Sequence, residues 1–142
     1  MTDTVYDTTI VAFSNDDLAA RQAGNELDAR LAYLEEFLRG ERVALYNDRL
    51  SREYSEHVRE IRNDIVDGFI EALDLRGRKA ARSTLSRPDY AKSLRAGWPT
   101  HDQHLLAAAL VGARTVILVT ERALSDCTGD IKKFFGFRVI RT

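Results

Sequence analysis

Four acidic residues occupy positions that a chain of alternating strands and helices would bring to one edge of a sheet. Asp7 lies inside the apolar run at residues 5–13, although burying an unpaired carboxylate costs several kcal/mol. Glu53 and Asp102 lie in helical segments, and Glu121 directly follows the apolar run TVILVT. A buried Asp7 therefore needs a partner, such as a cation, a set of N–H donors or an arginine.

Acids that converge need a compensating positive charge. Two carboxylates about 5 Å apart repel by roughly 3 kcal/mol at an effective dielectric constant of about 20. A divalent cation supplies that charge, and oxygen ligands without Cys or His suit Mg²⁺ or Mn²⁺ better than zinc. Each acid alone also has an ordinary explanation: a turn cap for Asp7, a solvated helix face for Glu53, a helix-dipole partner for Asp102 and a turn for Glu121.

Short apolar runs predict the strands that position these acids. TVILV is continuous and typical of a parallel strand covered on both faces, whereas the arginines of the last run indicate an edge strand. Strands that alternate with helices predict a three-layer α/β domain with a mainly parallel sheet, formed by residues 1–142 as one unit. In such sheets ligands bind at the carboxyl ends of the strands. The predicted strands are residues 4–8, 42–46, 115–119 and 137–141.

The first half of the chain has two helix-start signals. TTIVAFSN is expected to be the turn after the first strand, with helix caps at residues 14–17 and a helix that Gly40 ends. Asn47 or Asp48 is expected to cap the next helix, which carries Glu53.

The second half contains a long helical pattern and a buried helix. The pattern over residues 49–73 predicts one helix, with Gly68 as the place where it divides. Residues 76–97 form a basic segment that is helical in parts and broken by Gly77, Pro88 and Gly97, with seven basic residues against one acid.

Two further helices are expected before the last strand. Thr100 is a good N-cap for a helix that Gly112 ends, and LLAAALV within it is apolar all round, so that helix is expected to be buried. A short helix around residues 130–135 leads to the last strand.

The bulk properties favour a cytoplasmic protein. No segment approaches the roughly 18 consecutive apolar residues of a membrane span, and MTDTVYD lacks the basic and apolar regions of a signal peptide. The single cysteine, Cys127, cannot form an internal disulfide, which fits a reducing compartment. We therefore expect a cytoplasmic location and no membrane association.

The motifs together resemble those of the PIN-domain nucleases, including the VapC-like toxin ribonucleases of bacterial and archaeal toxin–antitoxin pairs. VYDTTIVAFSN is similar to the opening motif hhDTNhhh, where h is apolar, with Asp7 as its aspartate and Thr9 at the usual asparagine. ALYNDRLSREYSEHV resembles the second motif, with Glu53 as its acid, and HDQHLLAAALVGARTVILVT resembles the third, with Asp102. FGFRVIRT resembles the closing strand, so the resemblance covers nearly the whole chain.

The fourth acidic position departs from the family pattern. The family usually follows the third of these strands with TxD, whereas this chain reads VTERALSD and has Arg122 at that aspartate. Glu121 or, less directly, Asp126 is the candidate to replace it.

The resemblance implies an Mg²⁺- or Mn²⁺-dependent ribonuclease. Asp7 and Asp102 would hold the metal, with Glu53 binding it directly or supporting its ligands, and Thr8 or Thr9 would orient Asp7 or the attacking water. An antitoxin protein and a homodimer are the implied partners. The alternative is a PIN-like module that has lost catalysis and binds RNA or protein, with Arg122 neutralising the acids in place of the metal.

The RNA substrate would need a basic surface, since the acids alone repel it. Arginine suits phosphate because its planar fork makes bidentate contacts, and Trp98 or Tyr90 could stack on a base. The alternative is a solvated basic face with Trp98 packed beneath it. The predicted phosphate contacts are Arg76, Arg78, Lys79, Arg82 and Arg87.

Overall fold

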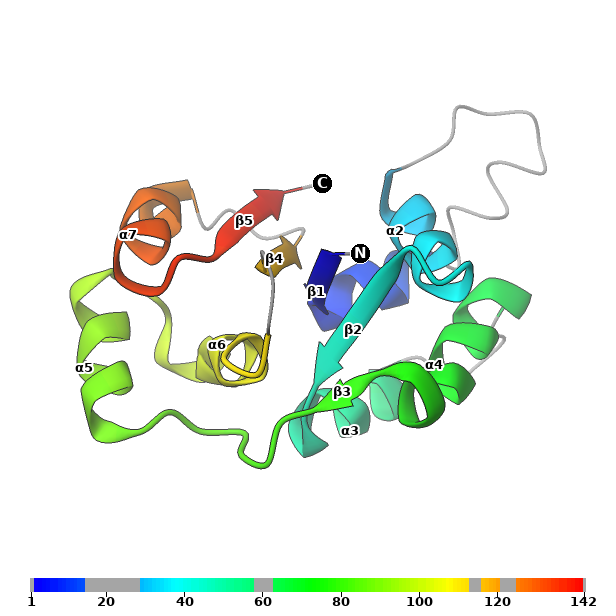
Figure 1. Ribbon diagram of the computed structural model, residues 1–142, viewed down its shortest axis with the longest axis horizontal. Coiled ribbons are helices and arrows are strands. Elements are labelled where there is room, and N and C mark those ends of the chain that lie inside the picture. Colours follow the sequence, from blue (N-terminus) through cyan, green and yellow to red (C-terminus); the bar gives the residue numbers. More distant parts are fainter. Residues whose placement is uncertain (1, 15–28, 58–62, 113–115, 121–124, 142) are drawn as a thin grey trace.

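Five parallel strands form the centre of the fold, in the order β3-β2-β1-β4-β5 (Figure 1). The computed structural model describes residues 2–14, 29–57, 63–112, 116–120 and 125–141, without the side chains of 29, 57, 125–129 and 141. The α/β class and the parallel sheet flanked by helices are as predicted. The strands are β1 (Thr2–Tyr6), β2 (Arg42–Tyr46), β3 (Arg78–Lys79), β4 (Val116–Thr120) and β5 (Arg138–Arg141).

The strand predictions hold for β2 and nearly for β4, and β5 is an edge strand as expected. β1 lies two residues earlier than predicted, so Asp7 follows the strand instead of lying inside it. The backbone N–H of Asp7 still donates to the Val119 carbonyl at 3.0 Å. Its own carbonyl then accepts from the N–H of Ile10 at 2.9 Å, so the sheet ends where a helix begins.

The turn predicted after the first strand is wrong, because residues 8–14 are helical. Ile10, Val11 and Ser14 are buried at helical spacing, and the Ser14 hydroxyl donates to the Ile10 carbonyl at 2.7 Å. The rest of the predicted cap and the start of the predicted helix lie outside the described residues. α2 (Ala29–Leu38) ends as expected before Gly40, whose φ of 79° suits glycine.

The long helical pattern divides into α3 (Asp48–His57) and α4 (Asp64–Arg76), and Gly68 is not the break. Gly68 lies inside α4, whereas Asn63 has an extended backbone and caps that helix by accepting from the Val66 N–H at 2.8 Å. The same Asn63 side chain also donates to the Ser14 carbonyl. This cap explains why the new helix begins here.

Two glycines of this region are expected to respond oppositely to alanine. A Cβ at Gly77, which ends α4, would lie 2.5 Å from the Leu73 carbonyl oxygen and 3.0 Å from the Tyr46 ring. At Gly68 it would make ordinary contacts of 3.7 Å with Leu38. Gly77→Ala is therefore expected to lower the free energy of unfolding by about 1–3 kcal/mol. Gly68→Ala should raise it by up to about 1 kcal/mol, because alanine favours helix.

Urea denaturation of both variants checks this prediction. Equal midpoints for the two variants would contradict the close approach of backbone to Gly77.

The basic segment contains more regular structure than expected. β3 pairs with the end of β2, and α5 (Arg87–Arg95) begins at the N-cap Ser86. Pro88 does not break this helix but lies in its first turn, where the missing N–H costs nothing.

The buried helix also starts differently. η1 (Thr100–Asp102) is a 3₁₀ turn that leads into α6 (Gln103–Ala109), and Thr100 is not the cap, because Pro99 occupies that position. α6 is buried as predicted from residue 104 to residue 109. α7 (Ser125–Phe135) is longer than the predicted short helix.

The helices form layers on the two faces of the sheet (Figure 1). α2 and α4 pack together and against β2, α6 lies against β1, β2 and β4, and α3 contacts both α4 and α6. α5 packs on α7, with Lys92 over the Phe135 ring and Arg95 over the Phe134 ring. β1 and β4 are neighbours at the point where the strand order changes direction along the chain. The carboxyl ends of the strands at such a point are the usual place for a ligand site.

The core contains an aromatic cluster next to the start of the site. Phe69 of α4 packs edge-on against Tyr6, Phe37 and Tyr54, with ring centroids 5.0, 5.2 and 5.7 Å away. None of the helices among the described residues is long and apolar enough to cross a membrane.

Candidate functional site

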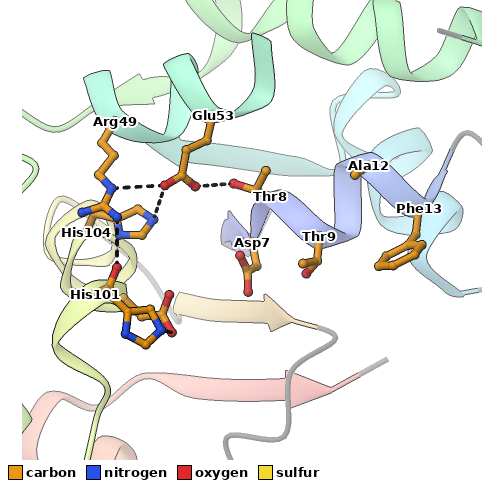
Figure 2. Close-up of a pocket in the computed structure, with 10 residues that line it drawn as sticks. Asp7, Thr8, Thr9, Ala12, Phe13, Arg49, Glu53, His101 and His104 are labelled. Carbon is orange, nitrogen blue, oxygen red and sulfur yellow. Dashed lines mark hydrogen bonds and ion pairs between the residues drawn. The ribbon is translucent and has the colours of Figure 1, made fainter. Parts of the chain in front are cut away.

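A cavity of about 410 Å³ opens beyond the carboxyl end of β1 (Figure 2). Three of the four acids that were predicted to converge border it, namely Asp7, Glu53 and Asp102. They come from the end of β1, from α3 and from η1. The other bordering residues are Thr8, Thr9, Ala12, Phe13, Arg49, His101 and His104.

Asp7 is buried, with 1% of its surface exposed, at the junction of β1 and the helical residues 8–14. The Thr120 hydroxyl, at the end of β4, donates to Asp7 Oδ2 at 2.8 Å. Tyr54 donates its hydroxyl to the carbonyl of the preceding residue, Tyr6. Burial, and then the nearby charge of Asp7, raise the pKa of Tyr54 well above its usual value, so this hydroxyl stays a neutral donor.

Glu53 is already engaged by three side chains. The Thr8 hydroxyl donates to Oε2 at 2.6 Å, Arg49 Nε donates to Oε1 at 3.1 Å, and His104 Nε2 lies 3.3 Å from Oε1. Figure 2 shows all three contacts. Burial alone would raise the pKa of Glu53, but His104, Thr8 and Arg49 together outweigh it and lower the pKa to about 2. The carboxylate is therefore ionised and fixed in orientation.

Two buried polar groups at the cavity have no hydrogen-bond partner within the described part of the chain. They are the Thr9 hydroxyl and the imidazole of His104, which is 1% exposed. The close approach of His104 Nε2 to Glu53 is an ion-pair distance without the alignment of a hydrogen bond. Buried polar atoms normally have partners, so these two are consistent with a site that receives a polar ligand.

Asp102 is held by the backbone of η1 and α6. Its side chain is 2% exposed, and His101 Nε2 lies 3.5 Å from its Oδ2. Trp98 is buried and donates its indole N–H to the Asp102 carbonyl at 2.9 Å. Trp98 therefore packs beneath the surface, as in the alternative interpretation, and cannot stack on a base.

Asn47 connects three elements next to the cavity by hydrogen bonds. Its amide donates to the His104 carbonyl at 2.9 Å and approaches the Arg82 carbonyl at 3.5 Å. Its Oδ1 accepts from the Leu50 N–H at 3.0 Å, so Asn47 is the cap of α3. The amide thus joins α3, α6 and the loop before α5.

The residues present are compatible with a hydrated Mg²⁺ or Mn²⁺. Mg²⁺ commonly keeps several waters and uses only one or two protein carboxylates, which Asp7 and Asp102 offer. Glu53, with both oxygens engaged, would support such a site instead of ligating directly. Among the described residues, no group of three His, Cys, Asp or Glu side chains could hold a metal ion by itself.

The fourth acidic position stays a prediction. Glu121 and Arg122 lie outside the described residues. Asp126 lies in the first turn of α7, but its side chain is outside them as well.

The predicted RNA contacts divide into two groups. Arg76 donates to the Leu38 carbonyl, Arg78 to the Val111 carbonyl, and Lys79 pairs with Asp48 at 2.6 Å, so these three have structural roles. Arg82 and Arg87 are exposed and make no side-chain hydrogen bond or ion pair with the described residues.

Five bordering residues were not among the predicted site residues, namely Ala12, Phe13, Arg49, His101 and His104. Arg49 precedes Glu53 by one helical turn, a spacing that the sequence shows. Phe13 follows Thr9 by the same spacing, but the helix that begins at Thr8 was read as a turn. His104 was hidden in the apolar helix. No family model, curated protein or solved structure matches this chain.

Proposed function

We propose that this chain is a PIN-like ribonuclease that cleaves RNA with the help of Mg²⁺ or Mn²⁺. The observation that carries the proposal is the pair of buried carboxylates, Asp7 and Asp102, which border one cavity from separate elements. A divalent cation bound by both would offset part of the cost of burying these two carboxylates. The reversal of strand order beside them favours a ligand site at the same place.

Three threonine hydroxyls at or next to the cavity have distinct roles in this proposal. When bound, the metal ion supplies an activated water and stabilises charge on the scissile phosphate. The Thr120 hydroxyl holds the Asp7 carboxylate in position, and Thr8 does the same for Glu53. The Thr9 hydroxyl, which lacks a partner among the described residues, is available to the substrate or to a bound water.

The proposed biological setting is a toxin–antitoxin pair. It rests on the resemblance of the motifs, which also implies a protein antitoxin and a homodimer. The proposed cytoplasmic location rests on the single cysteine, Cys127. Within the basic segment, Arg82 and Arg87 are the residues with guanidinium groups available for phosphate.

A catalytically inactive RNA- or protein-binding module is the second candidate. The contacts of Glu53 favour it, because Arg49 and His104 already place one cation and one imidazole against the carboxylate. Cations supplied by the protein would then neutralise the acids without a metal ion.

RNA cleavage and metal affinity separate the two candidates. The ribonuclease is expected to cleave single-stranded or structured RNA when Mn²⁺ is added and to stop when EDTA removes it. The inactive module should bind Mn²⁺ weakly or not at all in calorimetric titration. A chain that binds Mn²⁺ weakly and cleaves no RNA at any Mn²⁺ concentration would exclude the first candidate.

A further inference from the structure

Phe13 is an aromatic residue that borders the cavity and remains 43% exposed. It lies one turn after Thr9 on the helical residues 8–14, so the two side chains share a face. Figure 2 shows Asp7, Thr9 and Phe13 projecting to the same side, with Phe13 at the far end of the row. The three groups therefore form a line that runs from a buried acid to an exposed ring.

The surroundings of Phe13 are suited to a flat, electron-rich ligand. Arg30 of α2 lies over the ring, with its guanidinium carbon 5.1 Å from the centroid. An arginine plane beside an aromatic ring is a combination on which unpaired bases stack. Nearly half of Phe13 remains accessible despite this contact.

Distance and chemistry connect this ring to the acidic site. Phe13 lies six positions after Asp7 in the chain, which corresponds to about 9 Å along the helix axis. Between them lies the Thr9 hydroxyl, a buried donor and acceptor without a partner in the described part of the chain. A single strand whose phosphate lies near Asp7 could thus contact the hydroxyl and place a neighbouring base on the ring.

We infer that Phe13, with Arg30, forms a base-stacking subsite for single-stranded RNA at the rim of this cavity. The inference rests on the proposed function and deepens it by defining the substrate as an unpaired strand. Stacking uses the face of any base, so the subsite selects for unpaired bases and tolerates all sequences. Thr9 would contact the ribose or phosphate next to the stacked base.

Equilibrium binding in EDTA tests this without requiring cleavage. Fluorescence anisotropy would compare a labelled oligoadenylate with an oligonucleotide of the same length whose sugars carry no bases. The full chain is expected to bind the oligoadenylate about 5- to 150-fold more tightly, the range for one stacked base. Phe13→Leu should bring this ratio close to one, and Phe13→Trp should keep it.

Leu75→Ala is the matched control, because Leu75 is 86% exposed on α4 and does not border the cavity. It should leave the ratio unchanged, and thermal unfolding should show that all variants fold. An unchanged ratio in Phe13→Leu, an equal loss of both ligands, or no binding of RNA to the wild type would each overturn the inference. If the wild type cleaves RNA but Phe13→Leu leaves the affinity ratio unchanged, only the stacking subsite is contradicted. If the ratio depends on Phe13 but no RNA is cleaved, only the ribonuclease function is contradicted.

Discussion

Asp7→Asn is expected to reduce Mn²⁺-dependent RNA cleavage by at least about 100-fold. Replacing residues that merely support a metal ligand costs up to about 100-fold, and Asp7 is proposed to be a ligand itself. Asparagine has the shape of aspartate, and its amide oxygen can still accept from the Thr120 hydroxyl. The change therefore removes the charge while it keeps the packing. Initial rates on a single-stranded RNA with saturating Mn²⁺ measure the effect.

Two comparisons make this result specific. Asp102→Asn should cause a loss of similar size, because Asp102 borders the same cavity as Asp7. Asp48→Asn is the control, since Asp48 is an exposed acid on α3 that pairs with Lys79 and does not border the cavity. Thermal unfolding of each variant checks that a lower rate does not come from loss of the fold. Wild-type rates in Asp7→Asn would rule out the proposed metal site.

Asn47→Ala is expected to lower the free energy of unfolding by about 2–4 kcal/mol. The substitution removes the cap of α3, which alone is worth about 1 kcal/mol. It also leaves the buried His104 carbonyl without the amide that donates to it at 2.9 Å, a further cost of about 1–3 kcal/mol. Urea denaturation followed by circular dichroism measures the change.

Ser86→Ala is the matched control for that measurement. Ser86 also caps a helix, α5, but it is exposed and accepts from the Asp89 N–H at a longer 3.4 Å. Its loss should cost only about 0.5–1 kcal/mol. If both variants lose the same stability, Asn47 acts only as a cap and does not join α3 to α6.

The sheet could be predicted because its strands are short apolar runs between helices. The apolar pattern is sufficient to predict β2 and β4. β3 consists of Arg78 and Lys79, so it has no apolar pattern and could not be predicted. The run from Thr8 to Val11 is rich in β-branched residues, which locally favour extended structure. It is helical because Ile10 and Val11 are buried in the core, and local propensity cannot show that burial.

The convergence of the acids could be predicted from topology, but their contacts could not. The rule for parallel sheets places Asp7 at a carboxyl end, and the order of the elements brings Glu53 and Asp102 near it. The partners of Glu53 come from separate places in the chain. Arg49 is one helical turn away, but Thr8 is 45 residues distant, and such a pairing appears only in the folded chain.

The aromatic cluster around Phe69 also determines where Asp7 points. Tyr6 immediately precedes Asp7; its ring packs on Phe69, and its hydroxyl donates to the Tyr33 carbonyl at 2.7 Å. Tyr54 packs on the same phenyl ring and holds the Tyr6 carbonyl. The backbone that carries Asp7 is thus held in place by aromatic packing around Phe69 in the hydrophobic core. A substitution at Phe69 is therefore expected to shift the Asp7 carboxylate, although Phe69 is buried and does not border the cavity.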